Sequence, residues 1–255
     1  MAEGLRQVEV ADPYVTARES ATLPSMLRDA GVAVACYDLF AGFCRESADE
    51  RRAQVEPVRR GLERAASFDA KYVLILPGQV PPETPKETAR LWYIDGLEAC
   101  IPDARHLGLT ITIANLGSQA ALCGTTAHVL QIVDALAPDV RLTYDVGNFL
   151  MAGEGSLAAL DRVGDRVVHV HFKDWSITAP SETCIQDGGY PGLDGRCFEG
   201  VALGEGSVDL AGAAEGLHQR GYQGAVSVEY EGIGEPRIAV TAGTDYLRSL
   251  LASLT

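Results

Sequence analysis

Residues 167–173 read Val-Val-His-Val-His-Phe-Lys, and this stretch decides the fold. Polar and apolar side chains alternate along it, with His169, His171 and Lys173 on one face and Val168, Val170 and Phe172 on the other. An open sheet covered by helices on both sides would need two apolar faces. The pattern therefore favours a barrel whose interior becomes polar toward its catalytic end.

Outward from this stretch, β-rich runs alternate with segments of helical spacing. The runs are residues 7–10, 32–37, 72–76, 109–115, 141–146, 167–173 and 225–230. Such alternation predicts βαβ units and a parallel sheet, and 255 residues match the usual size of a (β/α)₈ barrel. We therefore expect one α/β domain over residues 1–255, a TIM-type barrel whose first βα unit is not evident.

An open dinucleotide-binding sheet would carry G-x-G-x-x-G after its first strand, and no run here is followed by that motif. The segment from 175 to 203 has no helical periodicity and contains Gly188-Gly189, Pro191-Gly192 and Asp194-Gly195. Because long irregular segments in compact domains are usually functional, we expect an active-site loop over 175–203.

The charge balance excludes several classes of partner. The chain has 21 Lys and Arg residues and 35 Asp and Glu residues, which gives a formal charge of −14. Non-specific nucleic-acid affinity and attraction to anionic membranes both need basic side chains, so neither partner is expected. No apolar run is long enough to span a bilayer, and Met1 to Val10 show no secretory signal. We expect a cytoplasmic protein.

Six cysteines occur at positions 36, 44, 100, 123, 184 and 197, without a C-x-x-C pair. We expect buried, reduced thiols rather than a zinc knuckle or redox motif. Cys184 and Cys197 share the Gly-rich segment and would be the pair to join under oxidising conditions.

Three polar residues end strands on the predicted interior face: Asp145, His171 and Glu229. Two carboxylates and an imidazole suit a divalent cation, with Mn²⁺ preferred and Mg²⁺, Co²⁺ or Zn²⁺ as alternatives. Each residue also has a structural explanation, as a turn Asp, a core His and a solvated Glu. Only a barrel that makes the three strands neighbours would join them.

Four motifs occur in an order that resembles the sugar phosphate isomerase/epimerase family, the xylose isomerase-like TIM barrels. They are Leu142-Thr-Tyr-Asp-Val-Gly-Asn148, Val168-His-Val-His-Phe-Lys-Asp174, Leu203-Gly-Glu-Gly-Ser-Val-Asp209 and Gly221-Tyr-Gln-Gly-Ala-Val-Ser-Val-Glu229. The resemblance implies a divalent metal held by Glu, Asp, His and Glu from four strands. Asp145, His171 and Glu229 match the last three ligands, and Asn148 stands where many relatives have His.

The first ligand of the family, a Glu in E-N-x-G, aligns with Ala114 of Ala114-Asn-Leu-Gly117. Alanine neither coordinates a metal nor moves a proton, whereas in ketose epimerases this Glu and the last one form an acid/base pair. A substitution made to disable the enzyme, natural divergence and misalignment all remain open as explanations.

Further residues complete the predicted site. Lys173 shares the face of His171 and is a candidate to hold a substrate oxygen, or alternatively to pair with a carboxylate. Substrate contacts are predicted for Glu9, Tyr37, Asn148, Asp174 and Trp175.

The resemblance implies a metal-dependent sugar isomerase or epimerase acting through an enediolate, with Glu229 moving the proton. A dehydratase or lyase on a keto-sugar or keto-cyclitol is the nearest alternative, because it needs one base and one acid. A catalytically silent barrel with a binding role is the other. The expected partner is a small sugar-like molecule, and a homodimer is common for such barrels.

Overall fold

The computed structural model describes residues 5–254, apart from the side chain of Ala120. Both ends of the predicted domain, residues 1–4 and 255, lie outside these described residues. The chain forms two compact units, one of residues 1–113 and 131–141 and the other of residues 114–130 and 142–255. That they act as a single domain stays a prediction.

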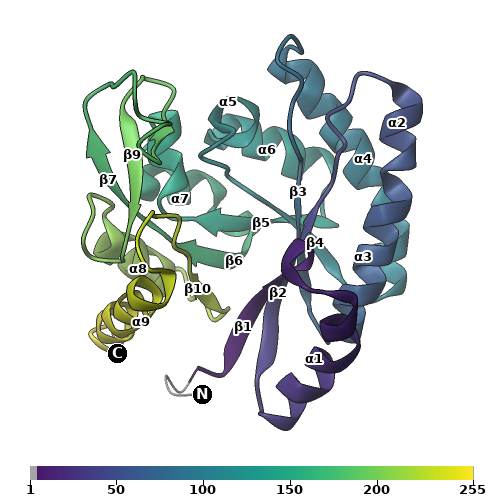
Figure 1. Cartoon of the computed structure of the whole chain (residues 1–255), viewed down its shortest axis with the longest axis horizontal. Coiled ribbons are helices and arrows are strands. Elements are labelled where there is room, and N and C mark those ends of the chain that lie inside the picture. Colours follow the sequence, from purple (N-terminus) through teal and green to yellow (C-terminus); the bar gives the residue numbers. More distant parts are fainter. Residues whose placement is uncertain (1–4, 255) are drawn as a thin grey trace. The chain divides into compact units, whose positions relative to one another are not determined.

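The first unit is built from parallel strands joined by helices (Figure 1). Each strand pairs with the next one in the chain: β1 (Gln7–Ala11), β2 (Ala33–Phe40), β3 (Tyr72–Leu76) and β4 (Thr110–Ala114). The connecting helices are α1 (Ala17–Asp29), α2 (Ala48–Ala53), α3 (Val55–Ser67) and α4 (Lys86–His106).

Local signals in the sequence explain where these helices begin and end. Thr16 and Glu19 form a capping box at α1, in which each side chain bonds the backbone N–H of the other. Gly108 follows α4 with φ at +71°, a left-handed conformation that glycine adopts without strain, and so ends the helix just before β4.

The second unit also contains parallel strands, in which β6 (Val167–Phe172) pairs with both β5 (Val140–Asp145) and β10 (Val226–Val228). Its helices are α5 (Ala120–Cys123), α7 (Ser156–Val163), α8 (Leu210–Gln219) and α9 (Pro236–Ala252), while α6 (Thr126–Ala135), β5 and the last residue of β4 cross the boundary between the units. All seven predicted parallel strands are thus present in residues 5–254.

Residues 175–203 are more ordered than the predicted loop. They contribute to an antiparallel sheet of β7 (Asp174–Thr178), β9 (Cys197–Val201) and β8 (Tyr190–Pro191), in that spatial order. Trp175 is its core, with ring centroids 5.6 Å from Tyr190 and 6.4 Å from Phe198. That this sheet covers an active site stays a prediction.

The cysteine prediction needs one correction. Cys184 and Cys197 form a disulfide that ties the segment before β8 to the start of β9, so the expectation of reduced thiols is wrong for this pair. It is confirmed for Cys36, Cys44, Cys100 and Cys123, which are buried thiols.

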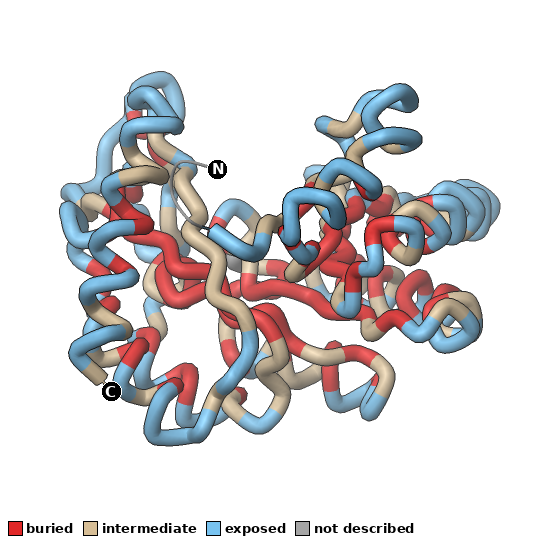
Figure 2. Tube along the Cα trace, turned by 90° about the horizontal axis from the view of Figure 1, so that it is seen from below, coloured by how far each residue is buried: buried red, intermediate tan, exposed pale blue. Residues whose placement is uncertain are grey.

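The buried residues lie mainly in the strands, whereas the outer turns of the helices are exposed (Figure 2). None of the helices in residues 5–254 combines the length and the apolar content that crossing a membrane requires.

Candidate metal centre

Strand register brings the three predicted ligands together within the second unit. Asp145 on β5 lies directly opposite His171 on β6. Glu229 follows the last residue of β10, and its N–H donates to the carbonyl oxygen of Phe172 at 2.9 Å. One ligand atom from each residue lies within 4.8 Å of the other two. These three residues, which are far apart in sequence, therefore form one cluster at the carboxyl ends of three neighbouring strands.

Lys173 lies in the same cluster, with its side chain only 3% exposed. Its Nζ is 2.9 Å from Glu229 Oε1, 3.3 Å from Asp145 Oδ2 and 3.2 Å from Glu231 Oε2. Glu231 is not among the residues predicted from the sequence. The signal was present, since Glu229 and Glu231 are two residues apart and the alternation of an extended chain places them on one face.

Two oxygens of the cluster fit a metal ion. Asp145 Oδ1 accepts the N–H groups of Gly147 and Asn148, both at 2.9 Å. Within the described residues, Asp145 Oδ2 is buried and accepts no hydrogen bond, with Lys173 Nζ 3.3 Å away, whereas Glu229 Oε2 is buried 2.8 Å from His171 Nδ1. Buried oxygens of this kind are costly unless a partner satisfies them. With the His171 imidazole, they make a donor set suited to a divalent cation.

In this cluster, burial and the charges of neighbouring side chains shift the pKa values in opposite directions. Burial raises the pKa of Asp145 from its usual range to about 7, despite the nearby Lys173. Burial would also raise the pKa of Glu229, but attraction to Lys173 and His171 outweighs it and lowers that pKa. For Lys173, burial would lower the pKa, and its three carboxylate neighbours raise it well above the usual range instead. Glu229 is therefore held ionised beside a charged ammonium.

Asparagine side chains fix the backbone around Asp145. The Asn115 amide accepts the N–H of Asp145 and donates to its carbonyl oxygen, both at 2.9 Å. Asn148 donates to the carbonyl oxygen of Asn115 at 3.0 Å, which gives its side chain a structural bond in addition to any substrate contact. Ala114, 4% exposed, is the last residue of β4 and immediately precedes Asn115.

Asp174 is engaged with the backbone. Its carboxylate accepts the N–H groups of Trp175, Gly204, Gly206 and Val208, at 2.9 to 3.1 Å. These bonds connect the end of β6 to the segment before α8, and they favour a positioning role over the predicted substrate contact. Trp175 is 1% exposed, and Lys173 Nζ lies 5.4 Å from its ring centroid, so the ring packs beside the cluster.

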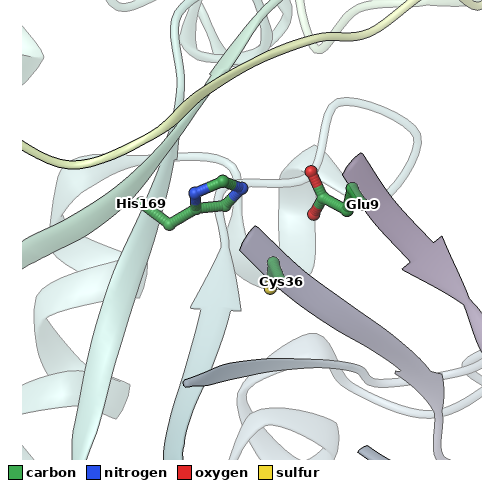
Figure 3. Close-up of side chains that lie close together, drawn as sticks. All are labelled: Glu9, Cys36 and His169. Atoms are coloured by element: carbon green, nitrogen blue, oxygen red, sulfur yellow. The ribbon is translucent and has the colours of Figure 1, made fainter. Parts of the chain in front are cut away.

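Two predicted substrate contacts belong to the first unit. Glu9 and Cys36, both labelled in Figure 3, are register partners on β1 and β2. Tyr37 therefore faces the other side of β2, where its ring packs 5.3 Å from that of Phe68 and its hydroxyl donates to Asp12 at 2.6 Å. This packing argues against the predicted substrate contact of Tyr37, whereas that of Glu9 stays a prediction.

Comparison with known proteins supports the motif-based resemblance. The profile of a family described as xylose isomerase-like TIM barrel matches residues 2–250, which confirms the predicted fold class. An inosose dehydratase of Lacticaseibacillus casei is 30% identical over 139 residues, which are 53% of this chain and 45% of that protein. The chain spans about half the length of the curated relatives it matches.

Solved structures of low sequence identity share the fold. A D-tagatose 3-epimerase-like protein matches 98% of this chain and 89% of its own, with 19% identity and a TM-score of 0.78. A zinc-bound IOLI protein matches 100% of this chain and 91% of its own, with 17% identity and a TM-score of 0.79.

Proposed function

We propose that this chain, which belongs to the xylose isomerase-like TIM barrel family, is a divalent-metal-dependent isomerase or epimerase of a sugar or sugar-like keto compound. The convergence of Asp145, His171 and Glu229 beside Lys173 carries the proposal. A zinc-bound protein and an epimerase-like protein of the same fold support it. Mn²⁺ is the preferred cation, with Mg²⁺, Co²⁺ and Zn²⁺ as alternatives.

The chain's own residues have separate roles in the proposed reaction. A bound cation would polarise the substrate carbonyl and acidify the neighbouring C–H group. Asp145 and His171 would hold the cation, and Glu229, kept ionised by its neighbours, would accept the proton from carbon. The Lys173 ammonium, 2.9 Å from Glu229 Oε1, stands where it can stabilise negative charge on a substrate oxygen in the enediolate.

A dehydratase acting on a keto-cyclitol or keto-sugar is the second candidate. Position 114 carries no carboxylate to act as a second base, whereas Glu229 and Lys173 already form a base and an acid in contact. Loss of water needs only this pair, with Glu229 taking the proton and Lys173 protonating the departing hydroxyl. The similarity to inosose dehydratase supports this candidate.

Proton exchange in D₂O separates these functions. The full chain with added Mn²⁺ is incubated with a panel of ketoses and keto-cyclitols and followed by NMR. Deuterium entering the carbon next to the carbonyl, with no loss of water, supports the isomerase or epimerase. An unsaturated product supports the dehydratase. No exchange on any compound, with metal bound, contradicts both and leaves a binding role.

Matched variants link the exchange to the site. Glu229→Gln removes the base and should abolish exchange, since a positioned general base contributes roughly 10²–10⁴-fold. Glu199→Gln, an exposed carboxylate on β9, serves as the control and should leave exchange unchanged.

A further inference from the structure

Lys173 and the proposed cation share an oxygen. Asp145 Oδ2 accepts no hydrogen bond in the described residues and is the oxygen that Asp145 offers to a cation, yet the Lys173 ammonium lies 3.3 Å from it. The same ammonium is 2.9 Å from Glu229 Oε1, on a carboxylate that also faces His171. Two positive charges at common oxygens repel each other strongly where water is excluded. A cation that binds here must therefore compete with Lys173.

Glu231 gives Lys173 a partner outside the ligand set. Its Oε2 lies 3.2 Å from Lys173 Nζ, and its side chain is 39% exposed, whereas that of Lys173 is 3% exposed. Glu231 does not belong to the cluster of Asp145, His171 and Glu229 that could hold a metal. An ammonium anchored by Glu231 can therefore remain close to the site while it releases the shared oxygens.

The backbone holds Glu231 in this place. A Cβ atom at Gly200 on β9 would collide with the backbone of Glu231 and with Gly232 N, so the antiparallel sheet packs directly on this segment. The position of Glu231 is thus set by the chain around it and not only by its own ion pair.

We propose that Glu231 is a positioning residue that holds the Lys173 ammonium beside the metal ligands and thereby sets the affinity of the site for a divalent cation. The inference rests on the metal-binding part of the proposed function. It assigns a role to Glu231 that neither ligation nor proton transfer requires.

The test is a double-mutant cycle read by calorimetric titration of the full chain with Mn²⁺. Glu231→Gln should weaken Mn²⁺ binding by about tenfold or more, because Lys173 is then drawn to Asp145 and Glu229, and a charge this close shifts a neighbouring equilibrium by about a unit or more. Lys173→Gln should tighten binding. In the Lys173→Gln background, Glu231→Gln should change the affinity by less than about threefold, since only a screened long-range effect remains.

Glu199→Gln is the matched control and should bind Mn²⁺ like the unmodified chain. Thermal unfolding of each variant in a chelator shows that it is folded. If Glu231→Gln weakens binding equally with and without Lys173, the carboxylate acts directly on the cation and the positioning role is wrong. If Glu231→Gln binds Mn²⁺ like the unmodified chain, Glu231 does not set the affinity and the proposal is wrong. If the unmodified chain binds no divalent cation, the proposed metal function fails and the inference fails with it.

Discussion

Asp145 and His171 face each other in register at the carboxyl ends of β5 and β6, and Asp145 Oδ1 is committed to two backbone donors while Oδ2 is not. The carboxylate is thus oriented by the turn that follows β5. One oxygen anchors the backbone and the other is presented to the cluster. This division allows a single Asp to be rigid and still to offer a ligand atom.

Metal binding should depend on pH through Asp145. Its pKa is raised to about 7 chiefly by burial, so below that pH the carboxyl carries a proton that a cation must displace. We expect Mn²⁺ affinity to rise as pH increases to about 7 and to level off above it. Titrations in two buffers of different ionisation enthalpy should detect more protons released per cation at pH 6 than at pH 8. A flat affinity across this range would contradict the protonation of Asp145.

Asp174→Ala should destabilise the protein strongly. The change leaves the N–H groups of Trp175, Gly204, Gly206 and Val208 without their acceptor. Gly204 and Gly206 are exposed and can bond water, whereas Trp175 and Val208 are buried, and each buried unsatisfied group costs about 1–3 kcal/mol. We expect a loss of about 3 kcal/mol or more in the free energy of unfolding, measured with urea. Asp161→Asn, at an exposed ion pair with Arg220, is the control and should change it by less than about 0.5 kcal/mol.

Reduction of the Cys184–Cys197 disulfide should destabilise the antiparallel sheet. The two residues are 13 apart, and closing a loop of this size stabilises the folded state by about 3 kcal/mol in the chain-entropy description. We expect a lower melting temperature in dithiothreitol. The double variant Cys184→Ser/Cys197→Ser should show a similar loss without reductant and no further response to it. Equal melting temperatures for the oxidised and reduced chains would show that packing around Trp175 stabilises the sheet without the disulfide.

The sequence predicted those parts of the site that follow from periodicity. Because side chains alternate along a strand and parallel strands end at one edge, His171 and Asp145 are candidates from their strands, and the barrel arrangement is needed to join them in one site. The same alternation places Glu231 on the face of Glu229, but the family-like motif that begins at Gly221 ends at Glu229 and does not include it.

Other features depend on contacts that no local pattern encodes. The four backbone partners of Asp174 include residues about thirty positions away along the chain, so its carboxyl was interpreted as a substrate ligand. The antiparallel sheet was missed because β8 has only two residues and Gly-rich turns separate β8 from β7 and β9. The sequence predicts a substrate contact for Tyr37, whereas the register of Glu9 with Cys36 turns its ring toward Phe68.

Ala114→Glu should strengthen metal binding and increase proton exchange. Ala114 is buried at the end of β4, and the next residue, Asn115, is bonded twice to the backbone of Asp145. Thr110, Thr112 and residue 114 share one face of the strand, so a Glu at 114 would extend from the polar face that the interior of the barrel requires. It would add a negative charge and supply a base in addition to Glu229.

Ala114→Gln has the same size without the charge and is the matched control. We expect Ala114→Glu, and not Ala114→Gln, to bind Mn²⁺ more tightly in calorimetric titrations. Deuterium exchange on the ketose panel should rise by roughly 10²–10⁴-fold if the alanine replaces a Glu in an otherwise intact site, because that is the contribution of a positioned general base. A pocket that has diverged around Ala114 would give a much smaller rise. If neither metal affinity nor exchange changes, position 114 does not correspond to the family's first ligand, and the site works with Asp145, His171, Glu229 and Lys173 alone.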